Sequence, residues 1–189
     1  MKLILVRHGE SEANEMQKSG VFFCGRWDCG LTAKGRTQAE SLKENRALPG
    51  ADAVFSSPLR RAADTAAAFA DRPVIYDARI VERSLGDFEG KWKKDLENRD
   101  EYRRYFTEEP FTDFRDSFTV SAPRGEHYGD VIRRVTPFLE ELKSRNYGKV
   151  IVVSHAIAIR CMIKVIRNLP EEETLRLRID QCDPVPLEF

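Results

Sequence analysis

Two continuous apolar runs are the most regular feature of the chain. Residues 3–6 read LILV and residues 149–154 read KVIVVS, and each run is of strand length. Runs of this kind are typical of interior strands in a parallel sheet, which are buried on both faces. Arg7 and His8 follow the first run, and His155 follows the second. If the two strands are neighbours, both imidazoles face one crevice at the carboxyl ends of the strands, where open α/β sheets bind ligands.

Helical periodicity and shorter apolar runs account for much of the remaining chain. Thr32 is expected to cap a helix whose buried face carries Ala39 and Leu42. An apolar stripe from Tyr128 to Leu142 predicts a long amphipathic helix. The pattern also predicts a helix opened by a Ser57 cap and Pro58, a helix over 156–168, strands over 51–56 and 73–76, and a half-exposed edge strand over 175–179.

One segment, residues 88–122, has no clean periodicity. Basic residues alternate there with aromatic ones; the basic residues are Lys91, Lys93, Lys94, Arg103, Arg104 and Arg115. We expect a helical, partly irregular, lid-like insertion over the site. Its charged face is either solvated, as most such faces are, or selects an anionic substrate.

Composition narrows the classes of function. The 189 residues are expected to form one domain. Lys plus Arg and Asp plus Glu both number 31, so no basic field is available to attract nucleic acid or a membrane surface, although a local basic pocket remains open. Because no apolar run is long enough to span a bilayer and no signal peptide is recognised, we expect a cytoplasmic protein.

The four cysteines, Cys24, Cys29, Cys161 and Cys182, form no C-x-x-C pair and no zinc-type spacing. Reduced thiols and no metal site are therefore expected. Cys161 lies in an apolar helix and is expected in the core. Cys24 lies in a glycine-rich and aromatic loop, and it would be a nucleophile only if a base lay beside it.

The residues at the strand ends suit phosphoryl transfer. An imidazole can attack phosphorus when it is held in one tautomer, and positive groups then neutralise the equatorial oxygens. Arg7, a protonated His155, the Asn14 amide and an arginine at the start of the helix after Ser57, Arg60 or Arg61, are suited to that task. Glu82 is the expected proton donor to the leaving oxygen. This chemistry requires no metal or cofactor.

Several motifs together resemble the histidine phosphatase superfamily, which includes the cofactor-dependent phosphoglycerate mutases. They follow one another along nearly the whole chain: LVRHGESEAN around His8, GRWDCGLTAKGRTQA at 25–39, SSPLRRAADTA at 56–66, VERSLGDFEG at 81–90, GEHYGDV at 125–131 and VVSHA at 152–156. The expected architecture is a three-layer α/β/α sandwich with a mainly parallel sheet and an antiparallel edge strand near the C-terminus, similar to phosphoglycerate mutase.

The resemblance also implies roles for individual residues. It implies His8 as the phosphorylated nucleophile, Glu82 as the acid and base, and Arg7, Arg61 and His155 as the phosphate pocket. Asn14, Cys24, Gly25 and Ala156 fall on substrate-binding positions. Two of these depart from the family pattern, because Ala156 replaces a glycine and Cys24 replaces a small hydroxylated residue.

Three functions follow from this resemblance, in decreasing order of expectation. The first is a phosphatase that hydrolyses a small phosphorylated metabolite through a phosphohistidine on His8. It is preferred because mutases usually have longer lid and C-terminal segments. The second is a phosphoglycerate mutase, since Arg83 and the Arg103-Arg104 pair resemble mutase segments that hold a substrate carboxylate. The third is an inactive module that binds a phosphorylated ligand. The sequence predicts neither the individual substrate nor the oligomeric state.

Overall fold

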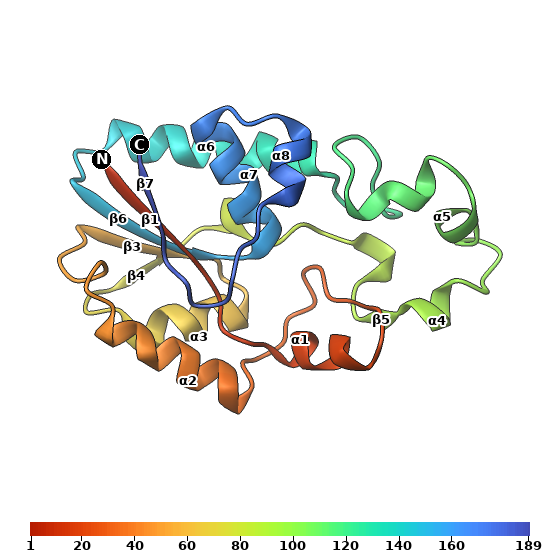
Figure 1. Ribbon diagram of the computed structural model, residues 1–189, viewed down its shortest axis with the longest axis horizontal. Coiled ribbons are helices and arrows are strands. Elements are labelled where there is room, and N and C mark those ends of the chain that lie inside the picture. Colours follow the sequence, from red (N-terminus) through yellow and green to blue (C-terminus); the bar gives the residue numbers. More distant parts are fainter.

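The two apolar runs form neighbouring parallel strands at the centre of a five-stranded sheet (Figure 1). A computed structural model describes all 189 residues. The sheet order is β4-β3-β6-β1-β7, with β7 antiparallel to β1 and the other pairs parallel. The strands are β1 (Lys2–Arg7), β3 (Ala53–Ser56), β4 (Val74–Tyr76), β6 (Lys149–Ser154) and β7 (Val185–Glu188).

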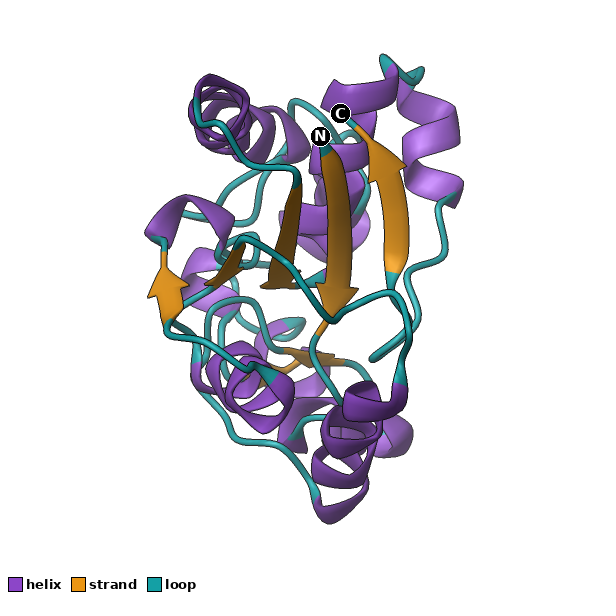
Figure 2. Cartoon of the chain, turned by 90° about the vertical axis from the view of Figure 1, so that its left-hand side faces the viewer, coloured by secondary structure: helices purple, strands orange, loops and turns teal.

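Helices cover both faces of this sheet, as Figure 2 shows from the side. The longer ones are α2 (Ala33–Ser41), α3 (Arg60–Phe69), α6 (Tyr128–Ser144) and α7 (Ala156–Arg167). The shorter ones are α1 (Glu12–Met16), α4 (Lys93–Leu96), α5 (Arg104–Thr107) and α8 (Glu171–Arg176). A separate two-stranded sheet pairs β2 (Phe22–Phe23) with β5 (Lys91–Trp92). The architecture is the three-layer α/β/α sandwich expected from the sequence.

Alternate side chains of β1 divide between two cores. Leu3 and Leu5 pack in the larger core with α6 and α7, whereas Ile4 and Val6 pack in the smaller core with α3 and the residues after α2. All four are fully buried. Each side chain of this kind contributes roughly 1.5–3 kcal/mol to folding, so the strand that carries Arg7 at its end is held from both faces.

Most of the predicted elements are confirmed, but the edge strand is not where the sequence places it. Residues 175–179 hold the end of α8 and an extended loop, and the antiparallel edge strand is β7. Leu175, Leu177 and Ile179 do face the larger core while Arg176 and Arg178 are exposed, but these residues pair with no strand. The Leu177 and Ile179 carbonyls instead accept from the side chains of Arg160 and Arg7. Pro186 lies within β7, which an edge strand tolerates because one side needs no ladder hydrogen bond.

The helix after Ser57 also differs from its prediction. α3 begins at Arg60, and its N-cap residue, Leu59, offers no side-chain cap; the Arg60 amide donates to Oδ1 of Asp28 at 2.7 Å. The Ser57 hydroxyl accepts from the Leu59 amide at 3.3 Å and also lies 2.8 Å from Nε2 of His155. A residue predicted as a helix cap therefore contacts the second histidine.

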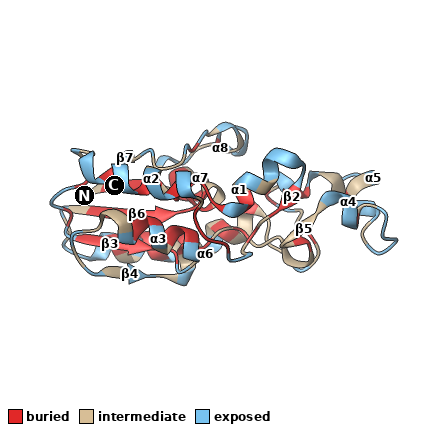
Figure 3. Ribbon diagram, turned by 90° about the horizontal axis from the view of Figure 1, so that it is seen from below, coloured by how far each residue is buried: buried red, intermediate tan, exposed pale blue.

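The 88–122 segment is helical and irregular, as its sequence predicts. It holds β5, α4, α5 and a 3₁₀ turn at Phe111–Arg115, beside the main sheet (Figure 1). Its buried aromatic residues form a small cluster of their own, together with Phe23 of β2. Figure 3 colours α4 and α5 largely as exposed or intermediate. Whether this segment acts as a lid stays a prediction.

Every helix is too short or too polar to cross a bilayer.

Candidate active site

The parallel register of β1 and β6 brings His8 and His155 together. Arg7 pairs with Ser154, and the His8 amide donates to the Ser154 carbonyl at 3.1 Å. The two imidazole centroids are 5.1 Å apart. His8 lines a cavity, while His155 is fully buried beside it. The predicted proximity of the two imidazoles is therefore confirmed, but only His8 lines the cavity.

The backbone after β1 holds His8 in one tautomer. Nδ1 of His8 lies 2.7 Å from the Gly9 carbonyl oxygen, and because a carbonyl only accepts, Nδ1 carries the proton and Nε2 keeps a lone pair. Gly9 is needed here for close packing, since a Cβ on it would lie 2.4 Å from the Gly35 carbonyl oxygen of α2. This loop thus packs closely against α2, and Nε2 is the ring nitrogen of His8 that keeps a free lone pair.

Both histidines are neutral at pH 7. Burial, followed by the charge of Arg61, lowers the pKa of His8 and the pKa of His155 well below their usual range. In the ligand-free chain His155 is therefore neutral, and its protonation when phosphate is bound stays a prediction. Nδ1 of His155 is buried without a hydrogen-bond partner, so one ring nitrogen beside His8 is uncommitted.

Arg7 and Asn14 are braced by the loop after α8. Arg7 donates from Nη1 to the Ile179 carbonyl at 2.8 Å, and its buried Nε has no partner. Oδ1 of Asn14 accepts from the Ser11 amide, the Ser11 hydroxyl and Nε2 of Gln181, at 3.1, 2.9 and 2.8 Å. Because these donors occupy the Asn14 oxygen, its amide group is the part that can bind a ligand anion.

Arg61 is buried and its side chain passes under the loop at 24–29. It donates from Nη1 to the Trp27 carbonyl and from Nη2 to the Gly25 carbonyl, both at 2.9 Å. Arg60 points elsewhere and pairs with Asp64 at 3.6 Å. Arg61 lines the cavity and Arg60 does not, as the resemblance implied.

Hydrogen bonds to its carboxylate and to its backbone carbonyl hold Glu82 in place. Oε1 accepts from the Arg83 amide at 2.7 Å, and Oε2 accepts from the Ile157 amide at the start of α7 at 3.3 Å. Arg26 and Arg134 both donate to the Glu82 carbonyl. The same two arginines pair with Glu126, which sequence reasoning missed.

The remaining predicted residues also line the cavity. Cys24 and Gly25 lie on the loop over Arg61, and Ala156 is the first residue of α7. Gly25 has φ +52°, and a Cβ there would lie 2.7 Å from Oε1 of Glu89. Only glycine fits that turn without strain.

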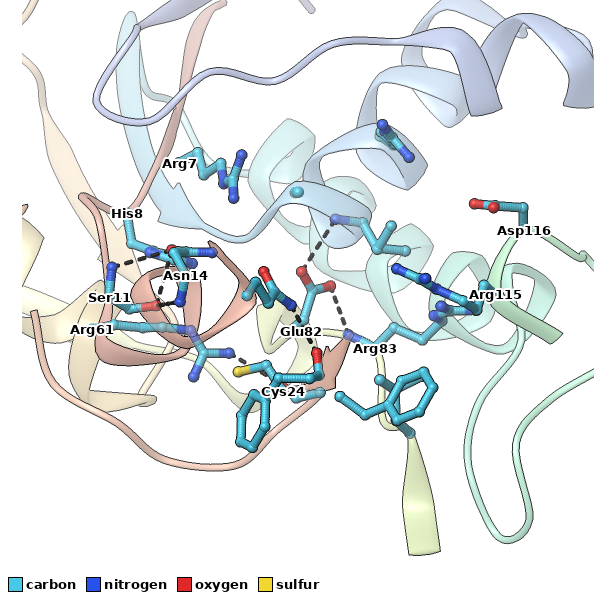
Figure 4. A pocket seen from close by; sticks show the side chains of 18 residues that line it. Arg7, His8, Ser11, Asn14, Cys24, Arg61, Glu82, Arg83, Arg115 and Asp116 are labelled. Atoms are coloured by element: carbon cyan, nitrogen blue, oxygen red, sulfur yellow. Dashed lines mark hydrogen bonds between the residues drawn. The ribbon is translucent and has the colours of Figure 1, made fainter. Parts of the chain in front are cut away.

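The cavity has a volume of about 300 Å³ and two chemically different ends (Figure 4). The histidine end carries Arg7, His8, Asn14 and Arg61. The distal end carries Arg83, Arg115, Asp116 and Arg160. Glu82 lies between them in Figure 4. Five arginines and two carboxylates line the cavity, so a neutral chain has a locally basic pocket.

Two residues of the distal end, Asp116 and Arg160, were not predicted. The sequence could have indicated Arg160, because it lies four residues after Ala156 and therefore on the same face of α7. Of the six basic residues noted in the 88–122 segment, Arg115 lines the cavity. Arg103 pairs with Asp100, and Arg104 stacks on Tyr105 and Phe111.

The family model of the histidine phosphatase superfamily (branch 1) matches residues 3–189. The chain belongs to this family. A 2,3-bisphosphoglycerate-dependent phosphoglycerate mutase of Bifidobacterium longum is 35% identical over 222 residues, which cover 100% of this chain and 86% of the mutase. Phosphoserine phosphatase 1 of Hydrogenobacter thermophilus is 33% identical over 168 residues, covering 86% of this chain and 74% of that protein.

Solved structures of the histidine phosphatase superfamily share the fold across the whole chain. The alpha-ribazole phosphatase of Shigella flexneri superposes with a TM-score of 0.83 at 28% identity, covering 100% of this chain and 90% of that one. Relatives of this chain thus include both phosphatases and mutases.

Proposed function

We propose that the chain is a phosphatase that hydrolyses a small phosphomonoester through a phosphohistidine on His8. The observation that carries the proposal is the neutral imidazole of His8 at the histidine end of a cavity of about 300 Å³. Its tautomer is fixed by the Gly9 carbonyl, so Nε2 keeps a lone pair. A nucleophile with a lone pair, beside cations that bind phosphoryl oxygens, is what phosphoryl transfer to nitrogen requires.

In the first step, Nε2 of His8 attacks phosphorus and the ester oxygen leaves. Arg7, Arg61 and the Asn14 amide bind the equatorial oxygens, where negative charge spreads in the transition state. Glu82, carrying a proton, gives it to the leaving oxygen, so that an alcohol departs. The negative charge of the bound phosphoryl group also favours protonation of His155, which is buried against His8.

In the second step, water attacks the phosphorus of phosphohistidine. The Glu82 carboxylate, now without its proton, takes one from that water. The phosphorus–nitrogen bond breaks, inorganic phosphate leaves, and His8 and Glu82 return to their starting protonation states. Neither step uses a metal or a cofactor, which stays a prediction of this mechanism.

The arrangement of the 88–122 segment favours hydrolysis over mutase chemistry. The Arg103-Arg104 pair, expected to hold a substrate carboxylate in a mutase, makes its contacts away from the cavity. The alignment with the Bifidobacterium mutase also runs over 222 positions, against 189 residues in this chain, so at least 33 of its positions have no counterpart here.

A mutase is the second candidate, and Arg83 favours it. Arg83 is 6% exposed, its Nε is buried without a partner, and it lines the distal end. A buried guanidinium with an uncommitted donor suits a second anionic group on the substrate, such as a carboxylate. A phosphatase with a carboxylated substrate would use Arg83 in the same way. We therefore propose that the substrate carries a second anion opposite its phosphate.

A turnover assay on a panel of phosphate esters, run after EDTA treatment, separates these candidates. The panel would include phosphoserine, 3-phosphoglycerate, a ribose phosphate and a neutral alkyl phosphate, each with and without 2,3-bisphosphoglycerate. Phosphate release that His8→Ala abolishes, strongest for the carboxylated esters, supports the phosphatase. Isomerisation of phosphoglycerate without net phosphate release would identify a mutase instead. Binding of these esters without any turnover would contradict both candidates, and loss of turnover on EDTA treatment would refute the metal-free mechanism.

A further inference from the structure

Two cysteines lie on the loop that holds Arg61. The loop reads CGRWDC from Cys24 to Cys29. The Trp27 amide donates to the Cys24 carbonyl at 2.9 Å, which turns the chain back on itself. Cys29 is buried with Ala13 and Phe22, and the side chain of Cys24 packs against that same cluster. The two sulfurs are thus gathered beside the active-site cavity, which Cys24 lines.

Both sulfurs are tied to the Arg61 binding loop. Sγ of Cys29 lies 3.9 Å from Nη1 of Arg61, and Sγ of Cys24 lies 3.8 Å from the Trp27 carbonyl oxygen. That carbonyl is also an acceptor for Arg61. A change in either sulfur therefore acts on the position of a guanidinium assigned to the phosphoryl group.

The pKa values of the two thiols are shifted in opposite directions. Interaction with the Cys24 thiol is the main cause that lowers the pKa of Cys29 to about 6, and the Arg61 charge acts in the same direction. The same interaction, together with burial, raises the pKa of the Cys24 thiol. Burial raises the pKa of Cys161 and that of Cys182 to about 12. The Cys29 sulfur can therefore accept the proton of the Cys24 thiol.

We propose that Cys24 and Cys29 form an oxidation-sensitive pair that a hydroperoxide converts to a disulfide, and that this disulfide switches off phosphate binding. The peroxide reaches Cys24, because this sulfur lines the cavity and Cys29 is buried. The Cys24 sulfur attacks the peroxide oxygen as its proton passes to Cys29, the O–O bond breaks, and a sulfenic acid on Cys24 and one water form. The Cys29 sulfur then attacks the sulfenic sulfur, and its proton leaves with the hydroxyl as a second water. Two thiols lose two electrons to one hydrogen peroxide.

The disulfide acts on catalysis through Arg61. It removes the Cys29 sulfur from the guanidinium, and it draws together the ends of the loop whose Gly25 and Trp27 carbonyls hold Arg61. Misplacement of such a group by about 1 Å costs on the order of 100-fold in rate. A thiol reductant should restore the activity, because no other bond changes. This site is additional to the proposed function, and its formation does not depend on that function.

The test treats the full chain with hydrogen peroxide at pH 7 and follows three readouts. Titration should find two of the four thiols lost, and peptide mapping should find Cys24 joined to Cys29. Binding of inorganic phosphate and turnover of the best ester should both fall by on the order of 100-fold, and both should recover with dithiothreitol. The thiol and mapping readouts apply even if no ester is turned over.

Three variants make the test specific, each compared with its own untreated sample. Cys24→Ser should be insensitive to peroxide, while Cys29→Ser should stop at a sulfenic acid on Cys24 that dimedone traps. Cys182→Ser is the matched control and should respond as the wild type does. The proposal is overturned if no Cys24–Cys29 disulfide forms, if it forms without loss of phosphate binding, or if Cys24→Ser is inactivated like the wild type.

Discussion

The histidine end and the distal end of the cavity are built in opposite ways. Arg7 and His8 follow a strand that is buried on both faces, and Arg61 is 2% exposed on α3. At the distal end, Arg115 and Asp116 are exposed and lie beside the small aromatic cluster of the 88–122 segment. Arg83 links that end to the main body by donating from Nη1 to the Phe114 carbonyl at 2.9 Å.

This difference separates chemistry from selectivity. Groups that must meet a phosphoryl transition state need fixed positions, which a packed sheet and its flanking helices supply. Groups that choose among substrates can lie on a segment with its own cluster, because sequence changes there leave the sheet intact. The comparison predicts large rate effects at the histidine end and affinity effects at the distal end.

The largest effect in this comparison is expected for Arg61→Ala. Loss of a buried cation that stabilises the transition state should lower kcat/KM by on the order of 10²–10³-fold. Arg60→Ala, the neighbouring exposed arginine, is the matched control and should retain nearly full activity. Steady-state kinetics on both variants would check this. Equal losses in the two variants would contradict the assignment of Arg61.

A smaller effect is expected at Glu126, which lies behind Glu82 and outside the cavity lining. Its carboxylate holds Arg26 and Arg134, and these two arginines hold the Glu82 carbonyl. Glu126→Gln keeps the shape but weakens both ion pairs, and it should lower kcat by on the order of 10-fold through misplacement of Glu82. KM should change little. An unchanged kcat, or a loss confined to KM, would show that Glu126 does not position Glu82.

The distal residues should act on KM rather than on kcat. Arg115→Ala should raise KM for a carboxylated ester by about 3- to 5-fold, since an exposed ion pair is worth about 1 kcal/mol or less. Asp116→Asn removes a negative charge beside Arg83 and should lower KM for the same ester. A neutral alkyl phosphate should be indifferent to both changes. An equal effect on the neutral ester would remove the distal end from substrate selection.

The pH dependence of stability tests the burial of the histidine end. His8 and His155 have lowered folded-state pKa values, so below pH 6.5 the unfolded chain binds protons that the folded chain does not. The free energy of unfolding should be level above pH 7 and fall below pH 6.5, by about 1.4 kcal/mol per pH unit for each histidine. Urea unfolding at pH 5.5, 6.5 and 7.5 measures this. His8→Gln should halve the slope, and a flat profile would contradict buried neutral rings.

Much of the histidine end could be predicted because its signals are local. An unbroken apolar run marks a strand that is buried on both faces, and parallel pairing alone brings the ends of two such strands together. Arg7, His8 and His155 follow from that. Gly9 is needed for close contact with Gly35, which lies far along the chain, so no local pattern predicts it.

The errors have the same cause. Leu175, Leu177 and Ile179 face the core as an edge strand's side chains would, but the Leu177 and Ile179 carbonyls bond the side chains of Arg160 and Arg7 and not a neighbouring strand. Only the tertiary structure decides such partners. Ser57 precedes a proline as a helix cap would, but its hydroxyl lies against His155. Arg115 and Asp116 owe their positions to packing among aromatic rings, and no spacing in the sequence encodes that packing.

The central claim is that His8 becomes phosphorylated during turnover. Rapid mixing with a phosphorus-labelled ester, quenching in alkali and peptide mapping would test it most directly. A phosphoryl group on His8 that is stable to base and labile to acid, formed and lost at rates no slower than kcat, is the predicted result, with no label on His8→Ala. Full turnover without that adduct, or retained turnover in His8→Ala, would contradict the account.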